Sequence, residues 1–110
     1  MSTETTVASP SLVAARPTFK ARYDHFIDGK WQAPDSGEYF ENTSPIDGKV
    51  FTRAARGNAA DIEKAVKAAN KAFLSWSKTS VTTRSNLLLK IAQVIEDNLE
   101  YLAIVETIDN

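Results

Sequence analysis

The side chains that could do chemistry in this 110-residue sequence are few and scattered. There is no cysteine, which excludes a disulfide framework, a thiolate zinc site and a cysteine nucleophile. The only histidine, His25, lies in a predicted strand beside aromatic residues, and we expect no acid or nucleophile to act with it, so we interpret it as a packed or edge residue. The four glycines are isolated and form neither GxGxxG nor GxxxxGK[ST], so no nucleotide-binding loop is indicated.

Two further polar clusters have structural explanations. Glu96, Asp97 and Glu100 lack a histidine or another carboxylate at ligand spacing, which favours a helix cap and a solvated helix end over a metal site. Ser80 and the threonines that follow it lie at a predicted helix start, where capping accounts for their hydroxyls. The residues by themselves therefore indicate no catalytic constellation.

Charge and hydropathy exclude two classes of partner. Thirteen basic and fourteen acidic residues give a net charge of -1, without the basic excess that nucleic-acid binding needs. No run approaches the roughly eighteen apolar residues of a membrane helix, and no signal peptide is recognisable. We therefore predict a soluble, cytoplasmic protein that binds neither nucleic acid nor membrane.

The first 22 residues differ in composition from the rest. They are rich in Ser, Thr, Ala and Pro and have no helical or strand period, so we predict a disordered tail over residues 1–22 and a folded part over residues 23–110. A transit peptide is the alternative. Arg16, Lys20 and Arg22 fit it, whereas Glu4 and the absence of an amphipathic stretch oppose it.

Two Asp-Gly pairs predict hairpins. Asp28-Gly29 lies between aromatic flanks, and such a pair tolerates the positive φ angles of a type I′ turn. Asp47-Gly48 separates residues 38–42 from residues 50–55, and Pro45 ends the earlier strand because proline cannot donate to a ladder. We expect one small antiparallel sheet.

A first helix is predicted to begin after Asn58, whose side chain can cap it, with Asp61 favoured at its positive end. Its apolar residues recur every three or four positions opposite a charged face, so we expect one buried and one solvated side. This stripe consists of Ile62, Ala65, Val66, Ala69, Ala72, Phe73 and Trp76.

Two more helices follow. Ser80 is predicted to cap a helix over residues 81–97, and Asp97 with Glu100 resembles a capping box for a third helix from near Asn98. The third helix reaches Asn110 without a stop signal, and both helices carry apolar residues beyond a single stripe. We interpret these features as a truncated domain that further protein should cover.

Five segments in order resemble the N-terminal part of the aldehyde dehydrogenase superfamily, and the resemblance covers residues 23–110. Within the superfamily, the sequences of Tyr23–Trp31 and Gly37–Asn42 are most similar to those of bacterial acetaldehyde dehydrogenases. The segments are Phe26–Trp31, Phe40–Val50, Asp61–Trp76, Arg84 with Leu87–Ala92, and Glu106–Asn110.

The resemblance implies an α/β fold, in which N-terminal β-hairpins and three helices form the first part of a Rossmann-like cofactor domain. It also implies the oxidation of an aldehyde to a carboxylic acid with NAD or NADP in a full-length homo-oligomer. The cysteine nucleophile and the glutamate of that reaction belong to a later part of the family's sequence. We therefore expect this fragment to be an inactive piece of an oxidoreductase that binds no cofactor.

The resemblance also suggests a monovalent cation site, formed by a backbone carbonyl near Asn42 and the carboxylate of Asp109. A hairpin residue and a helix-end residue explain the same positions without an ion. An alternative for the whole chain is a short interaction module, without catalytic activity, that docks on a full-length dehydrogenase through its uncovered helices.

Overall fold

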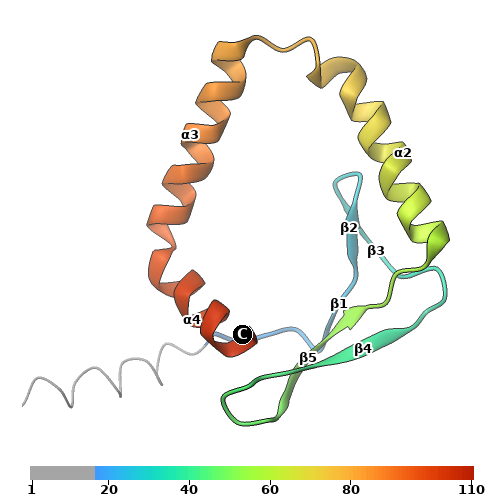
Figure 1. Cartoon of the computed structure of the whole chain (residues 1–110), viewed down its shortest axis with the longest axis vertical. Helices are drawn as coiled ribbons and strands as arrows, with labels where there is room; N and C mark the ends of the chain where they lie inside the picture. The colour runs from blue at the N-terminus through green and yellow to red at the C-terminus, as the bar shows by residue number, and fades with distance from the viewer. Residues whose placement is uncertain (1–16) are drawn as a thin grey trace, which may run out of the picture.

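A computed structural model describes residues 17–110, and most of the predicted tail, residues 1–16, lies outside this range. Five strands are followed by three helices (Figure 1). Their bounds are β1 Arg22–Tyr23, β2 His25–Ile27, β3 Lys30–Gln32, β4 Tyr39–Thr43, β5 Val50–Ala55, α2 Ala59–Trp76, α3 Val81–Asp97 and α4 Leu99–Asp109.

The first predicted hairpin is confirmed. β2 and β3 pair antiparallel, and Ile27 lies opposite Lys30, which leaves a two-residue turn. Asp28 and Gly29 both adopt positive φ angles, 56° and 73°. A two-residue turn with positive φ at both central positions matches the right-handed twist of its strands, so this Asp-Gly pair sets the register.

The second hairpin is also confirmed, but the prediction of one antiparallel sheet is wrong. β4 pairs antiparallel with β5, and β1 pairs parallel with the other edge of β5, while β2 and β3 form a separate two-stranded sheet. The parallel pair arises because the chain passes through the first hairpin and β4 before it returns as β5. Such a crossover has no local sequence signal.

The predicted boundary of the tail at residue 22 lies a few residues too late. Arg22 belongs to β1, and the Phe19 ring packs edge-on against Phe51 with centroids 4.9 Å apart. The hydroxyl of Thr52 donates a hydrogen bond of 2.7 Å to the carbonyl of Lys20. Residues 19–22 are therefore held on β5 by aromatic packing and hydrogen bonds that their composition does not reveal.

The helices begin where the sequence predicts, with one difference in capping. Asn58 caps α2 by accepting a hydrogen bond from the Asp61 amide, and Ser80 caps α3 by accepting one from the Thr83 amide. Asn98 precedes α4 but makes no side-chain cap. The predicted capping box of Asp97 with Glu100 is wrong, because the Asp97 carboxylate instead accepts a hydrogen bond from the Gln93 side chain.

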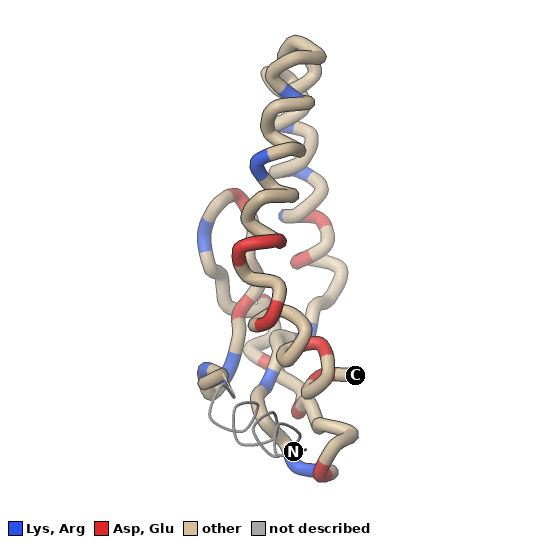
Figure 2. Tube along the Cα trace, turned by 90° about the vertical axis from the view of Figure 1, so that its left-hand side faces the viewer, with Lys and Arg blue, Asp and Glu red and all other residues tan. Residues whose placement is uncertain are grey.

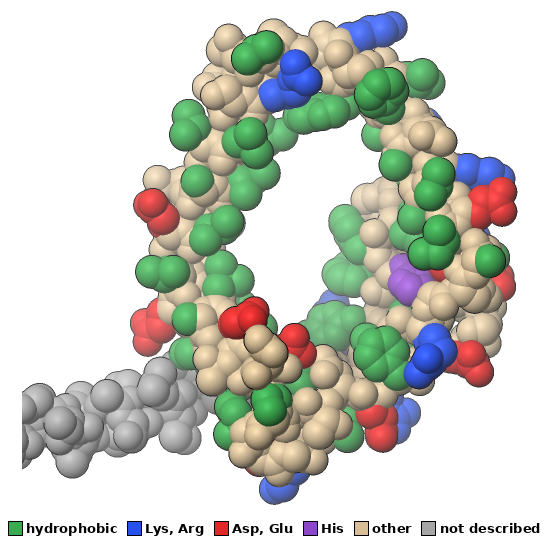
Figure 3. All heavy atoms as spheres, viewed as in Figure 1, with side chains coloured by type: hydrophobic (Ala, Val, Ile, Leu, Met, Phe, Trp, Pro, Cys, Tyr) green, Lys and Arg blue, Asp and Glu red, His purple; other side chains and the backbone are tan. Residues whose placement is uncertain are grey.

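The helices and strands surround an opening and do not pack around a core (Figures 1 and 3). The radius of gyration is 19.0 Å, whereas a compact chain of this length has about 13 Å. The molecule extends 61 × 41 × 17 Å, and its thin dimension is seen in Figure 2. Among the described residues, Ile108, at 3% exposure, is buried, and of the other apolar residues only Pro34 is buried with it.

The expected burial of one side of the first helix is therefore wrong for this chain. Ile62 is 63% exposed, and the larger members of the predicted stripe on α2 are exposed with it. The spacing is amphipathic as predicted, but none of the elements that the structure describes covers the apolar side.

None of the helices described, over residues 17–110, is both long enough and apolar enough to cross a membrane.

Candidate functional site

The two residues of the predicted cation site lie next to each other. Asn42 is near the end of β4, and Asp109 is the last residue of α4. The Asn42 side-chain amide donates a hydrogen bond of 2.7 Å to Asp109 Oδ1 across 67 positions of sequence. This contact joins the end of the last helix to the edge of the sheet, so the fold brings the two positions together.

The hydrogen bond determines what this pair can do chemically. Asn42 presents an N–H donor to the carboxylate, so each group satisfies the other without an ion. Within residues 17–110, no three acidic or histidine side chains gather into a group that could hold a metal ion. Any cation here would need the second oxygen of Asp109 together with backbone carbonyls.

A second polar centre surrounds Asp61, in the first turn of α2. Its side chain accepts hydrogen bonds from the backbone amides of Asn58, at 3.1 Å, and Asp35, at 3.0 Å. The side-chain nitrogen of Asn58, Nδ2, also donates a hydrogen bond of 3.0 Å to the Asp35 carboxylate. Asp61 is 3% exposed, so one buried carboxylate ties the start of α2 to the turn that follows β3.

Electrostatics favour the ionised form of Asp61. Burial by itself would raise the pKa of this carboxyl, but the backbone amides of Asn58 and Asp35 and the neighbouring His25 outweigh burial and lower the pKa below 3.8. His25 Nε2 lies 3.5 Å from Asp61 Oδ2, which is an ion pair when the imidazole is protonated. The same nitrogen has no hydrogen-bond partner among the described residues.

The prediction for His25 as a packed residue is confirmed, because its side chain is only 23% exposed. The expectation that no acid lies near it is wrong, because Asp61 Oδ2 is 3.5 Å from its Nε2 atom. Sequence reasoning missed the centre to which it belongs. Asn58 and Asp61 have the spacing of a capping box, and that signal could have been found. The contacts of Asp61 with Asp35 and His25 span 26 and 36 positions and have no local signal.

A third cluster joins β4 to the start of the sheet. The Tyr39 hydroxyl donates a short hydrogen bond to Asp24, and the Arg22 guanidinium stacks over the Tyr39 ring at 4.7 Å. The hydrogen bond to Asp24 and partial burial raise the pKa of Tyr39. A phenol with a raised pKa is a poorer acid at neutral pH, so this cluster acts structurally.

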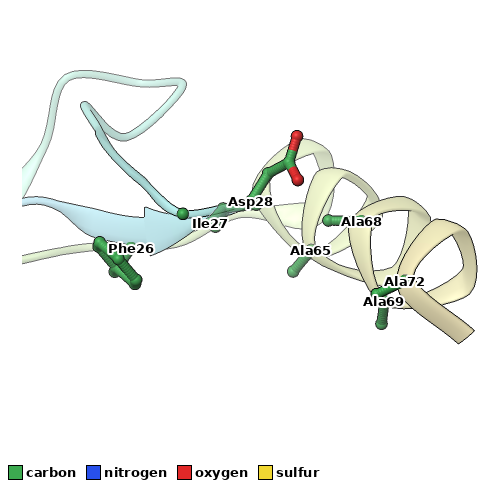
Figure 4. Close-up of a pocket in the computed structure, with 8 residues that line it drawn as sticks. Phe26, Ile27, Asp28, Ala65, Ala68, Ala69 and Ala72 are labelled. Atoms are coloured by element: carbon green, nitrogen blue, oxygen red, sulfur yellow. The ribbon is translucent and has the colours of Figure 1, made fainter. Parts of the chain in front are cut away.

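A hollow of about 410 Å³ lies between the first hairpin and α2 (Figure 4). The hairpin contributes Phe26, which is 62% exposed, and the helix contributes alanines that leave room beside its backbone. The lining residues are Phe26, Ile27, Asp28, Gly29, Ala65, Ala68, Ala69 and Ala72. The hollow therefore combines apolar side chains with backbone and with the carboxylate of Asp28.

α3 has a wide apolar arc. None of its residues is buried, and Leu87, Ile91 and Val94 follow one side of it. Lys90 and Gln93 follow the other side, where Leu89 is 67% exposed. An apolar arc of this kind is normally covered by other elements. The fold thus defines an α/β segment with apolar surfaces that the described residues leave uncovered.

The chain belongs to the aldehyde dehydrogenase family. The model of that family, described as "Aldehyde dehydrogenase family", matches residues 31–110. The chain is 56% identical over 103 residues to an aldehyde dehydrogenase of Deinococcus radiodurans, and 55% identical over 101 residues to a long-chain-aldehyde dehydrogenase of an Acinetobacter species. These matches cover 94% and 92% of this chain and 20% of each relative.

Solved structures agree with the family assignment. The crystal structure of an indole-3-acetaldehyde dehydrogenase in complex with NAD⁺ matches 90% of this chain with a TM-score of 0.83 and 34% identity. This chain covers 20% of that protein. The chain thus spans about a fifth of the length of the relatives it matches, which confirms the prediction of a fragment with the α/β fold of this family.

Proposed function

We propose that this chain is the first part of an NAD(P)-dependent aldehyde dehydrogenase whose complete form oxidises an aldehyde to a carboxylic acid. The observation that carries the proposal is the identity of more than half over nearly the whole chain to enzymes of that name. In such a reaction a cysteine thiolate attacks the aldehyde carbon, and a glutamate-activated water releases the acid. Neither residue belongs to the described segment, so its role is to build the domain that positions them.

Among the described residues, the start of α2 does not fit the phosphates of NAD(P). A dinucleotide phosphate is usually held by free amides at a helix N-terminus that follows a glycine-rich turn. The start of α2 follows Gly57, but the Asn58 side chain occupies the Asp61 amide and the Asp61 carboxylate places a negative charge there. The complete protein must hold the cofactor through other residues.

An activity assay on two proteins tests this proposal. The 110-residue chain, mixed with NAD or NADP and short or long aliphatic aldehydes, should form no reduced nicotinamide above a buffer control. The complete product of the gene should turn over, and a thiol-alkylating reagent should abolish that turnover because it removes the nucleophile. Saturable turnover by the short chain, or turnover of the complete protein that resists alkylation, would contradict the proposal.

We also propose that Asn42 and Asp109 form part of a monovalent cation site in the complete protein. The hydrogen bond of 2.7 Å between their side chains supports this, because the two positions already share one small region. The ion would contact the Asp109 carboxylate and backbone carbonyls near Asn42. In the complete protein, exchange of choline chloride for KCl or NaCl should raise the melting temperature, and Asp109→Asn should remove that increase. An equal response of both proteins would refute the site.

We further infer that the complete protein is a cytoplasmic homo-oligomer that acts on an aldehyde and does not bind nucleic acid. The family resemblance supports the oligomer, and the net charge of -1 on this chain supports the absence of a nucleic-acid partner for this segment. Light scattering on the complete protein tests the oligomer, and a monomer would contradict it.

A further inference from the structure

One ring nitrogen of His25 has no role in the fold or in the proposed function. Within residues 17–110, His25 Nε2 is the only buried side-chain nitrogen or oxygen without a hydrogen-bond partner. It lies 3.5 Å from Asp61 Oδ2, a carboxylate that is itself buried. Buried polar atoms in proteins are nearly always hydrogen-bonded, so an exception of this kind calls for an explanation.

The imidazole lies where two separate parts of the fold meet. His25 belongs to β2 in the two-stranded sheet, and Asp61 belongs to the first turn of α2, which packs against β2. The backbone of Gly57 closes another side of the ring. A Cβ atom at Gly57 would lie 3.5 Å from Cε1 and 3.6 Å from Nε2 of the imidazole. The ring therefore has little room to turn away from the carboxylate.

Asp61 is the charged group that faces the imidazole from α2. Across the hairpin, the residue paired with the histidine is Gln32, which is uncharged. The other charged side chains of α2 and β3 that are nearest in sequence to these residues are exposed, and water and salt screen exposed charges. They are Glu63, Lys64 and Lys30.

The other surrounding segments hold their charges in contacts of their own. In the turn after β3, the Asp35 carboxylate accepts a hydrogen bond of 3.0 Å from the Asn58 side chain. Before β2, Asp24 accepts a hydrogen bond from a tyrosine hydroxyl of β4. Before α2, the Arg56 guanidinium stacks over a phenylalanine ring of β4 at 5.5 Å. The main electrostatic contact of the imidazole is therefore the one with Asp61.

We propose that His25 and Asp61 form a pH-dependent contact, which fastens the first hairpin to α2 when the imidazole is protonated and loosens when it is neutral. A protonated imidazole is a donor at both ring nitrogens, so Nε2 gains a charged acceptor in Asp61. A neutral ring offers the carboxylate no charge. Imidazole is the side chain that ordinarily changes its charge between about pH 5 and 8.

The carboxylate keeps its charge throughout that range. Burial alone would raise the pKa of Asp61, but the backbone amides of Asn58 and Asp35 and the neighbouring His25 lower the pKa below 3.8. The contact is therefore strongest at pH values above the pKa of Asp61 and below the range in which imidazole loses its proton. It should weaken as the pH rises through neutrality.

Hydrogen exchange at the backbone amides of Asp35 and Asn58 tests the proposal, because both amides donate to the Asp61 carboxylate. His25→Gln keeps a planar polar side chain and removes its titration. Wild-type protection, divided by that of this variant at the same pH, should be about fivefold at about pH 5.5 and within about twofold of unity at about pH 8. This ratio cancels the intrinsic pH dependence of exchange.

The assignment to His25 is direct, because the chain has one histidine and no cysteine. A ratio that is the same at both pH values, or that is larger at the higher pH, would overturn the proposal. The complete product of the gene is measured in the same way, and the same ratios are expected there. The inference goes beyond the proposed function and does not depend on it, since the readout is amide exchange and not turnover.

Two carboxylates provide a matched comparison for the partner of the imidazole. Asp61→Asn removes the charge that faces His25 and keeps a side-chain acceptor, whereas Asp24→Asn removes the neighbouring charge that the tyrosine of β4 holds. The pH dependence of the ratio should disappear in the Asp61→Asn background and persist in the Asp24→Asn background. The opposite result, or persistence in both backgrounds, would refute Asp61 as the partner.

Discussion

Replacement of Asn58 by alanine tests the junction at the start of α2 directly. The Asn58 side chain accepts a hydrogen bond of 3.1 Å from the Asp61 amide and donates one of 3.0 Å to the Asp35 carboxylate. Alanine removes both bonds but keeps the helix, because it has the highest helix propensity. The first turn of α2 should therefore open more often, while its middle stays unchanged.

The magnitude follows from the two lost bonds. Loss of an asparagine N-cap costs about 1 kcal/mol, and the exposed bond to Asp35 adds about 0.5 kcal/mol. A total of about 1–2 kcal/mol corresponds to an opening equilibrium shifted roughly 5- to 30-fold. Hydrogen exchange at the backbone amides of Asp61 and Ile62 should accelerate by this factor. The Asp61 amide donates to the Asn58 side chain, and the Ile62 amide donates to the Asn58 carbonyl.

Asn58→Ser is the matched control. Serine keeps the cap acceptor and loses only the donor to Asp35, so it should recover most of the protection. Exchange near Phe73, three turns further along α2, reports whether the effect is local. If Asn58→Ala left exchange at Asp61 unchanged, or accelerated it equally along the whole helix, the capping argument would be wrong.

Three further predictions concern the strands and the buried carboxylate. Thr52→Val leaves the Lys20 carbonyl without its hydroxyl donor and should destabilise the pairing of β1 with β5 by about 1–2 kcal/mol. Hydrogen exchange of the Arg53 amide, which bonds to the Ala21 carbonyl, should become faster. Thr52→Ser keeps the hydroxyl and should leave this exchange unchanged. Gly29→Ala forces a side chain into a φ of 73° and should cost about 1 kcal/mol in the hairpin, visible as weaker cross-strand contacts between Phe26 and Trp31 in NMR. The folded pKa of Asp61 lies below 3.8, so its ionised form stabilises the fold above that pH and this contribution is lost as the pH falls further. Asp61→Asn should remove that acid-dependent part of the unfolding curve, and an unchanged curve would contradict the assignment.

Local signals in the sequence predicted most of the secondary structure. The Asp28-Gly29 turn, the caps at Asn58 and Ser80 and the starts of all three helices depend on residues within a few positions of one another. The parallel pairing of β1 with β5 and the contact of Asp61 with Asp35 depend on distant residues, and no periodicity encodes them. The sequence pattern therefore indicates elements better than their arrangement.

The apolar stripe on α2 shows the limit of the same reasoning. Its spacing indicates which side of the helix is apolar, but Ile62 is exposed because none of the described residues covers it. The proximity of Asn42 and Asp109 could be expected only from the family resemblance, since residues 67 positions apart share no pattern. Amphipathicity thus predicts a requirement for burial and does not predict what meets it.

The thin, open arrangement of the helices and strands has a consequence for synthesis on the ribosome. In a relative of which this segment is a fifth, roughly 400 residues remain to be translated after it, which takes about 20–80 s at the usual rate of elongation. Its helices can form within microseconds, because their hydrogen bonds are local. For most of that interval the nascent chain therefore presents finished helices with an uncovered apolar side, the kind of surface that holdase chaperones bind. Dependence on such chaperones should accordingly decrease only when the later part of the polypeptide has emerged.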